Sequence, residues 1–347
     1  MSNLPKGSSV LCHLYVRIED VVKLERHTSH DRYRVVHKLR NSSYSTIRLA
    51  QDEKLSKCVA SKICPNGTHA CYVTCPASMS LSDAKDGSYV SLFKLEAARV
   101  IAAQLVIAVD YIDTQGFAHG GLYCGNVRTE IPFGYTRLSD EELYKIYGEP
   151  ESEAVTHLDG KELSACIPSR AVVPVWFGDA SEEPAPSDAK ILLSDFGEAF
   201  FPAKHDKFET CTPLVNRAPE ARFESTTPLS FPSDIWSLAC LIWDTITQRP
   251  LLERLLASED QVTRDHKAWQ NKLSEDEKPI NRELYRSLAN RNQGVPPFEP
   301  AERDAVLSLL WSMLSFRSEN LPSAKEVLAS ELMVKWALPE YEKVQKP

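Results

Sequence analysis

The sequence lacks the features that would place this protein in a membrane or outside the cell. Its longest mostly apolar stretch, residues 97–112, is interrupted by Arg99, Gln104 and Asp110, so it is too polar to span a bilayer. Residues 1–7 contain no basic segment followed by an apolar one, which a secretory leader would need. We therefore expect no membrane partner and a location in the cytoplasm, the nucleus or both.

The cysteines form no CxxC pair, although the chain contains 9 of them. An odd number of scattered cysteines without a leader predicts reduced thiols rather than a disulfide framework. Four lie close together in the sequence and could bind zinc, namely Cys58, Cys64, Cys71 and Cys75. Their irregular spacings favour buried or surface thiols over a metal site.

The net charge of −8 is unevenly distributed along the chain. Residues 1–70 carry about +6 and residues 130–200 about −10. The acidic middle of the chain argues against nucleic acid as a partner, because a phosphate backbone would be repelled there. A basic peptide would be attracted to it; the alternative is an acidic surface that only keeps the protein soluble.

The N-terminal part of the chain has the pattern of a small β-sheet. Residues 32–39 alternate in strand fashion, and residues 45–51, 57–63 and 69–75 are short runs between turn signals. These four segments predict a small β-rich unit.

Helical spacing replaces this alternation from residue 91 onward. A long helix is predicted to run to a C-cap at Gly116, on apolar positions three to five residues apart: Leu92, Leu95, Val100, Ala103, Ile107 and Tyr111. Residues 130–190 are rich in Pro, Gly and acidic residues, which predicts an insertion with one short helix at 140–147. Residues 234–248 and 301–315 predict two further amphipathic helices.

Five short motifs follow one another in a fixed order. They are Val59–Lys62 on a predicted strand, His119–Asn126 after the long helix, Leu192–Gly197, Ala218–Glu220, and Asp234–Ser237 at the start of a helix. Phosphoryl transfer by a protein kinase uses a strand lysine, a catalytic loop and an Asp-Phe-Gly motif in this order, and an Ala-Pro-Glu motif follows them. Each motif is weak alone, but the ordered set resembles a eukaryotic protein kinase domain.

The resemblance narrows to the fungal branch of the SR-protein kinases, CMGC-type serine/threonine kinases that act on Arg/Ser-rich proteins. It rests on Tyr-Gly-Glu-Pro-Glu at 147–151, Leu-Asp-Gly-Lys at 158–161 and Leu-Leu-Ser-Asp-Phe-Gly-Glu-Ala-Phe at 192–200. Members of this family carry a long insertion between the catalytic loop and the Asp-Phe-Gly motif, which residues 130–190 match. A basic Arg/Ser-rich protein or peptide is therefore the implied partner.

The resemblance implies an α+β, bilobal protein-kinase fold in a monomer. Residues 1–30 would form an N-terminal extension and residues 31–78 an incomplete, β-rich N-lobe. Residues 79–340 would form a large, mostly α-helical C-lobe, with the insertion at 130–190 between the catalytic loop and the Asp-Phe-Gly motif.

The resemblance also implies which residues would serve ATP and Mg²⁺. The nucleotide would contact Ser42, Ser43, Ala60 and Lys62. The metal would be held by Asn126 and Asp195. The structural positions of the shared motifs are His119, Phe196, Gly197, Glu220 and Asp234; His119 would pack under Phe196 rather than act as an acid or base.

The catalytic loop departs from the family pattern at the decisive position. Gly121 stands where the family has its catalytic aspartate, and Tyr123 replaces the basic residue two positions later. A positioned acid–base group contributes about 10²–10⁴-fold to the rate of a reaction. The loss of this carboxylate predicts a catalytically impaired protein.

The nucleotide site departs from the pattern as well. Leu39–Thr46 keeps none of the glycines that let backbone amides approach a phosphate group. The chain passes from Lys62 almost directly to residues 65–69, so the αC helix and the glutamate that would pair with this lysine are missing. Arg128 stands at an apolar position beneath the adenine ring.

One structural ion pair of the family is also altered. Leu321 occupies the position of the arginine that pairs with Glu220, and Arg317 is the alternative partner.

Three hypotheses follow from these observations. The first is a pseudokinase, a kinase-fold module that binds a protein partner without phosphorylating it. The second is a weakly active ATP-dependent serine/threonine kinase that acts on Arg/Ser-rich proteins. The third is an incomplete gene model, or a decaying paralogue of an active kinase. Whether the chain is an enzyme stays open at this point.

Overall fold

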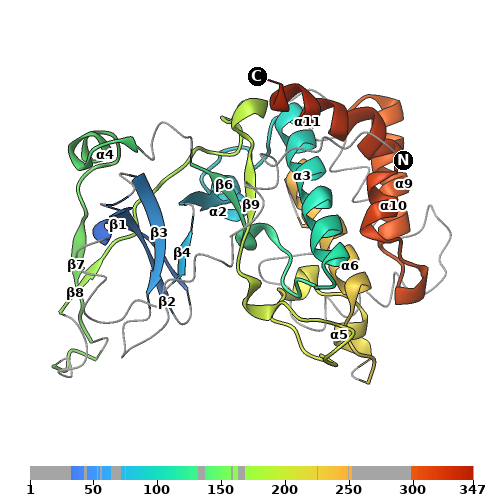
Figure 1. Ribbon diagram of the computed structural model, residues 1–347, viewed down its shortest axis with the longest axis horizontal. Helices are drawn as coiled ribbons and strands as arrows, with labels where there is room; N and C mark the ends of the chain where they lie inside the picture. The colour runs from blue at the N-terminus through green and yellow to red at the C-terminus, as the bar shows by residue number, and fades with distance from the viewer. Residues whose placement is uncertain are drawn as a thin grey trace. The chain divides into compact units, whose positions relative to one another are not determined.

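A computed structural model describes residues 33–42, 45–52, 54, 57–63, 72–74, 76–131, 137–157, 159–162, 169–224, 226–248, 250–251 and 298–346. The chain forms two compact units. Unit 1 combines residues 1–79 with 130–178, and unit 2 combines residues 80–129 with 179–347. Figure 1 shows their helices and strands.

Unit 1 contains an antiparallel sheet with the strand order β1-β2-β3-β4. Its strands are β1 (Tyr33–Ser42), β2 (Ser45–Asp52), β3 (Lys57–Ile63) and β4 (Tyr72–Thr74). A further strand, β5 (Ala77–Ser80), follows. The four strands predicted from the sequence are confirmed. β3 ends at Ile63 and β4 begins at Tyr72, and the positions between them lie outside the described residues.

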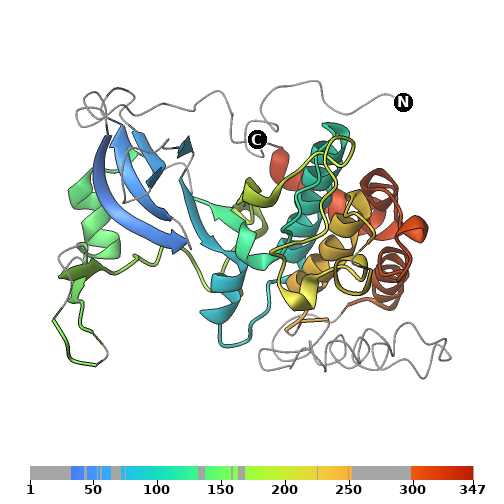
Figure 2. The same cartoon turned by 90° about the horizontal axis from the view of Figure 1, so that it is seen from below.

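The insertion completes the core of unit 1. Helix α4 (Asp140–Tyr147) begins with a capping box at Ser139 and occupies the predicted range. Its one buried residue, Leu143, shares a hydrophobic cluster with Val36, Leu49, Cys58 and Phe177. Figure 2 shows α4 beside β1.

This packing changes the domain assignment made from the sequence. The insertion was expected to belong to the larger, helical lobe, but its residues 130–178 form one compact unit with the small sheet. The physical reason is burial: Leu143 and Phe177 leave water by packing on the apolar face of the sheet. Arg34 of β1 also pairs with Asp140 of α4, and Nζ of Lys38 donates to the carbonyl oxygen of Val172 at 2.6 Å.

The insertion ends in a two-stranded ribbon. Strands β7 (Ser152–Ala154) and β8 (Arg170–Val172) pair antiparallel, and almost all of their residues are exposed. Arg170 of β8 reaches across to the carbonyl oxygen of Ser152 at 2.6 Å. The side chains of Arg170 and Lys38 thus bind backbone carbonyl oxygens at the edges of the ribbon, which could otherwise accept hydrogen bonds from another strand.

Unit 2 is built around two long helices. Helix α3 (Leu95–Thr114) packs on α6 (Phe231–Ile246), and thirteen of the residues of α6 are buried. The further α-helices among the described residues of this unit are α2 (Leu81–Asp86), α5 (Glu220–Phe223), α9 (Pro300–Met313), α10 (Ala324–Leu328) and α11 (Leu338–Gln345). The three helices predicted from periodicity in this unit are confirmed, with ends shifted by a few residues.

A buried ion pair links α3 to α9. Arg99 donates two hydrogen bonds of 2.7 Å each to the two carboxylate oxygens of Glu302, whose side chain is fully buried. Two parallel hydrogen bonds of this kind satisfy a carboxylate that burial would otherwise destabilise.

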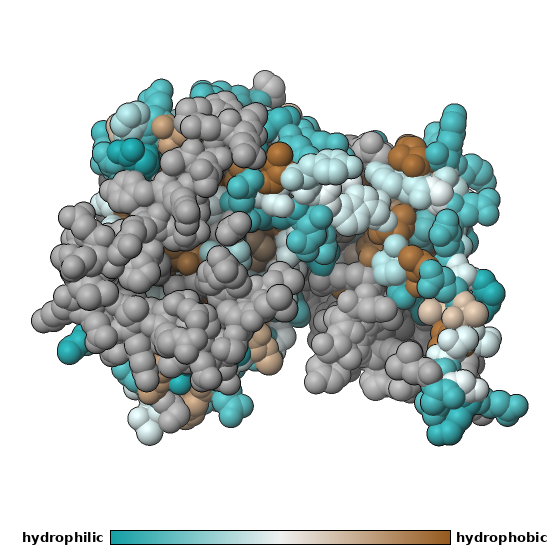
Figure 3. Space-filling model, turned by 180° about the vertical axis from the view of Figure 1, so that it is seen from behind, coloured by the Kyte–Doolittle hydropathy of each residue, from teal (hydrophilic) through white to brown (hydrophobic). Residues whose placement is uncertain are grey.

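On the face drawn in Figure 3, hydrophilic residues cover most of the coloured surface, and hydrophobic ones form small separate spots. Among the described residues, no helix is both long and apolar enough to cross a bilayer.

Candidate functional site

The catalytic-loop motif lies between α3 and a short antiparallel strand pair. After α3, a turn at Gly116 leads to residues 119–123, then to the 3-10 helix η2 (Cys124–Asn126) and strand β6 (Val127–Glu130). β6 pairs with β9 (Ile191–Leu193) in the register Val127↔Leu193. This pairing places the Asp-Phe-Gly motif, which follows β9, next to the catalytic-loop motif.

The histidine of the catalytic-loop motif is a buried packing residue. The His119 ring lies 4.7 Å from the Phe196 ring, and its Nε2 is 3.2 Å from the carbonyl oxygen of Ser194. Burial lowers the pKa of His119 to about 4, so the imidazole is neutral at pH 7. A neutral donor to a backbone carbonyl fits the structural role expected for it.

Asp234 fixes the backbone at the start of this loop. Its carboxylate, at the N-terminus of α6, accepts hydrogen bonds from the backbone N–H groups of His119 at 2.5 Å and Gly120 at 3.0 Å. Burial raises the pKa of Asp234 to about 6, and the two backbone bonds oppose that shift. The carboxylate thus holds the loop in place with no contribution from residue 121.

Gly121 contributes only backbone to the site. Its carbonyl oxygen accepts a hydrogen bond from Nδ2 of Asn126 at 2.9 Å. A Cβ atom at Gly121 would lie 3.6 Å from both Nδ1 of His119 and Nδ2 of Asn126, which is ordinary van der Waals contact. The loop therefore has room for a side chain, but it carries no carboxylate at this position.

The two expected metal ligands lie on neighbouring segments. Asn126 is buried, and its backbone carbonyl accepts hydrogen bonds from both the amide and the hydroxyl of Ser194 at 2.9 Å. Asp195 is exposed and has left-handed backbone angles, φ 65° and ψ 57°. Gly197 follows, and the 3-10 helix η5 (Phe196–Glu198) leads into the segment between the Asp-Phe-Gly and Ala-Pro-Glu motifs, which is called the activation segment below.

An oxygen donor set of this kind suits magnesium. With its amide nitrogen bonded to Gly121, Asn126 keeps its side-chain oxygen for a cation, and Asp195 supplies a carboxylate. Among the described residues, no group of three or more His, Cys, Asp or Glu side chains could hold a metal ion. Any magnesium would therefore also need oxygen atoms from a phosphate or from water.

The expected nucleotide contacts lie in unit 1. Lys62 and Ala60 are on β3, where Lys62 is opposite Ile47 of β2 and Tyr72 of β4. Ser42 ends β1, and Ser43 lies outside the described residues. Of the four clustered cysteines, Cys58 is a buried free thiol, and the other three lie outside the described residues.

Glu220 is buried and has no basic partner among the described residues. One carboxylate oxygen accepts a hydrogen bond from Oγ of Ser233 at 2.6 Å, while Oε2 has no partner among the described residues. Burial raises the pKa of this carboxyl. Arg317, the alternative partner considered from the sequence, is largely exposed and lies 3.7 Å from Glu319 instead.

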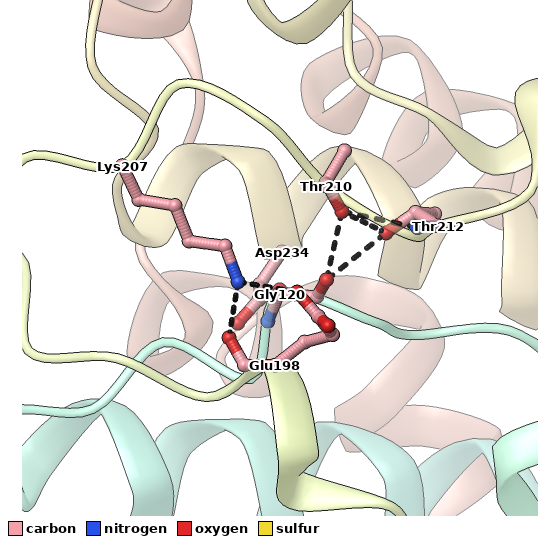
Figure 4. Close-up of polar contacts among 6 residues, drawn as sticks. All are labelled: Gly120, Glu198, Lys207, Thr210, Thr212 and Asp234. Carbon is pink, nitrogen blue, oxygen red and sulfur yellow. Dashed lines mark hydrogen bonds and ion pairs between the residues drawn. The ribbon is translucent and has the colours of Figure 1, made fainter. Parts of the chain in front are cut away.

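Sequence reasoning missed the polar contacts of the activation segment. Thr210 and Thr212 both donate to the carbonyl oxygen of Gly120, and Lys207 binds Glu198 (Figure 4). No spacing rule links these positions, because the segment between them is irregular. Only the three-dimensional arrangement brings them together.

The comparisons with known proteins agree with this geometry at the level of the fold. No protein-family model and no curated protein matches the chain. Among solved structures, the crystal structure of the PF14_0431 kinase domain aligns with a TM-score of 0.55 at 16% sequence identity. The alignment covers 92% of this chain and 99% of that chain. The chain therefore has the α+β protein-kinase fold, with a small sheet-containing unit and a helix-rich one.

Proposed function

We propose that this protein is a pseudokinase of the SR-protein-kinase type that binds a protein partner without transferring phosphate. The observation that carries the proposal is the backbone-only position at Gly121, where a kinase needs a carboxylate to orient the substrate hydroxyl. The surrounding loop is still held by Asp234, so the scaffold persists although the reacting group is missing.

The proposed partner is a basic, Arg/Ser-rich protein or peptide. Support comes from the acidic insertion, where Glu149, Glu151 and Glu153 are all exposed. Glu153 lies on β7 and the other two carboxylates shortly before it, so this part of the insertion presents concentrated negative charge to solvent. We also propose that the protein is a monomer, that it is located in the cytoplasm or the nucleus, and that it does not bind nucleic acid.

A weakly active kinase is the second candidate, and the retained Asn126 and Asp195 favour it. These residues would hold magnesium, which would neutralise charge on the phosphates of ATP. The absence of glycine from residues 39–46 argues against strong nucleotide binding. Without close backbone approach, the phosphates lose the amide donors that a glycine loop supplies.

A thermal-shift titration with Mg-ATP separates the two candidates. A ligand at a hundredfold excess over its Kd stabilises the folded state by about 2.7 kcal/mol. The pseudokinase proposal expects little or no shift in the unfolding temperature and no phosphotransfer to Arg-Ser peptides. A shift of several degrees that Asp195→Ala abolishes would show a working nucleotide site. Phosphotransfer by the unmodified chain well above that of the Asp195→Ala variant would refute the pseudokinase proposal.

A restoration series tests the reason for inactivity. Gly121→Asp alone should stay inactive, because the glycine loop and the helix glutamate are still missing. Gly121→Asp combined with a glycine loop and a family αC segment should recover activity, since these parts act as a unit.

A further inference from the structure

The Ala-Pro-Glu motif ends in a carboxylate that is buried against α6 with one side-chain donor. Glu220, the first residue of α5 (Figure 1), is 4% exposed. Its Oε1 accepts a hydrogen bond from Oγ of Ser233 on α6 at 2.6 Å. Its Oε2 has no hydrogen-bond partner among the described residues. An ionised carboxylate can accept about four hydrogen bonds, so most of this capacity is unused.

The basic side chains nearest to Glu220 in the sequence do not neutralise it. Arg217 donates two hydrogen bonds, of 3.2 and 2.9 Å, to the carbonyl oxygen of Thr212. The guanidinium carbon of Arg222 lies 5.6 Å from the centroid of an aromatic ring of α5. Burial raises the pKa of Glu220, and the negative charge of Glu224 raises it further. No basic side chain among the described residues opposes this shift.

The neighbouring elements bring no positive charge to this carboxylate either. The charged residues of α6 are two aspartates, Asp234 and Asp244. Arg317, which follows α9, lies 3.7 Å from Glu319, and both side chains are largely exposed. Glu220 is therefore surrounded by apolar and acidic groups, with a serine hydroxyl as its side-chain donor.

Helix α5 is held in place by a small number of contacts. Its Phe223 ring stacks on the Phe316 ring, with centroids 5.7 Å apart. Its Ala221 packs against the hydrophobic cluster that contains Phe200. The helix has only 4 residues, so its own helical hydrogen bonds give it little stability, and it depends on these contacts and on the hydrogen bond from Ser233. A short element of this kind can detach locally while the rest of the unit stays folded.

We propose that Glu220 makes the docking of α5 on α6 depend on pH. At low pH the carboxyl group is neutral, and its burial costs little. Ionisation at higher pH leaves a buried charge without a counter-ion, which is a costly arrangement. Movement of α5 away from Ser233 returns the carboxylate to water, so α5 detaches as the pH rises. The arginine expected at position 321 from the family resemblance would neutralise this charge, but Leu321 stands there. The inference does not depend on whether the protein transfers phosphate.

The proton linkage fixes the direction and the limit of the effect. When α5 is detached, Glu220 has its ordinary pKa of 4.5, whereas docking raises that pKa. The docked state therefore binds the proton more tightly, and docking is favoured at low pH. Because one proton is involved, the equilibrium constant for detachment rises by at most about tenfold per pH unit. The rise begins above pH 4.5 and ends once the pH exceeds the raised pKa.

Hydrogen–deuterium exchange of the full chain between about pH 5 and pH 8 tests the proposal, with rates corrected for the intrinsic pH dependence of amide exchange. The readout is the backbone amides of Arg222, Phe223 and Glu224, which donate to carbonyl oxygens at the start of α5. Their protection should fall as the pH rises. Glu220→Gln keeps a hydrogen-bond acceptor but cannot ionise, so protection in this variant should not change with pH. Glu224→Gln is the matched control, because Glu224 is an exposed glutamate at the end of the same helix, and it should retain the pH dependence.

Exchange in α9 serves as the internal check on folding. The proposal fails if protection in α5 of the unmodified protein is the same from pH 5 to pH 8. It also fails if Glu220→Gln retains the pH dependence while α9 stays protected. If Glu220→Gln loses protection in α9 as well, Leu321→Arg decides the question by supplying the missing cation. Loss of the pH dependence of α5 in Leu321→Arg supports the proposal, and an unchanged pH dependence refutes it.

Discussion

Truncating Leu143 tests whether the insertion is part of the core of unit 1. The side chain is 1% exposed and packs with Val36, Leu49, Cys58 and Phe177. Replacing a buried leucine with alanine typically costs about 2–5 kcal/mol, because apolar contacts are lost and a cavity remains. We expect Leu143→Ala to fall in this range.

The same helix supplies a matched control. Ile146 of α4 is 53% exposed, so Ile146→Ala should change the free energy of unfolding by no more than about 0.5 kcal/mol. Both substitutions shorten an aliphatic side chain on the same short helix. A difference between them therefore reports burial and not helix propensity.

Hydrogen–deuterium exchange of β2 and β3 is the appropriate assay, because it reads unit 1 separately from unit 2. A loss of 2 kcal/mol should speed exchange of their most protected amides by roughly 30-fold. Peptides from α3 and α6 should be unaffected. If Leu143→Ala leaves β2 and β3 as protected as Ile146→Ala does, the insertion is an appendage and the packing argument is wrong.

Three further predictions concern the buried ion pair of Arg99, the carboxyl group of Asp113 and the loop position of Gly121. Arg99→Met should destabilise the protein by about 3–5 kcal/mol in urea unfolding, because Glu302 is left buried and unpaired, and adding Glu302→Leu should recover most of the loss. Burial raises the pKa of Asp113 to about 8. Between about pH 4 and pH 8 the folded state therefore binds more protons than the unfolded state, so the stability of the protein falls as the pH rises through this range. The stability advantage of Asp113→Asn over the unmodified protein should therefore grow between pH 5 and pH 8, and a constant difference would contradict the assignment. Gly121→Asp should fold with a stability within about 1 kcal/mol of the unmodified protein, as judged by thermal unfolding, because the loop has room for its Cβ.

The predicted helix positions agree with the structure to within a few residues, and the differences at their ends have local causes. The predicted range of α4 matches the structure, which shows a capping box at Ser139. Helix α6 begins at Phe231, three residues before the predicted start, because Ser230 caps it and Pro232 fits the first turn. Helix α3 begins at Leu95 rather than near Ser91, whose φ of +51° is incompatible with a helix.

Contacts between distant parts of the chain could not be predicted in the same way. Leu143 and Phe177 meet Val36 across more than 100 positions, and apolar periodicity shows that a residue is buried without showing against what. The polar contacts of Lys207 and Thr210 have the same difficulty, since these are isolated polar residues in an irregular segment. The ordered motifs predicted the kinase fold because each motif has a fixed place in that fold.

The contacts of the motif residues separate those that act on the protein itself from the one that would act on a substrate. His119 and Asp234 act on the protein itself, and both keep their structural contacts. Residue 121 would act only on a substrate, and it is a glycine. Gly120 has a φ of +68°, and a Cβ there would lie 2.9 Å from the backbone oxygen of Glu198, so this position requires glycine for a structural reason. Glu220 is also buried with only Ser233 as a side-chain partner among the described residues, so the departures from the kinase pattern are not confined to position 121. The contacts that hold the catalytic-loop motif in place therefore do not depend on the side chain that residue 121 lacks.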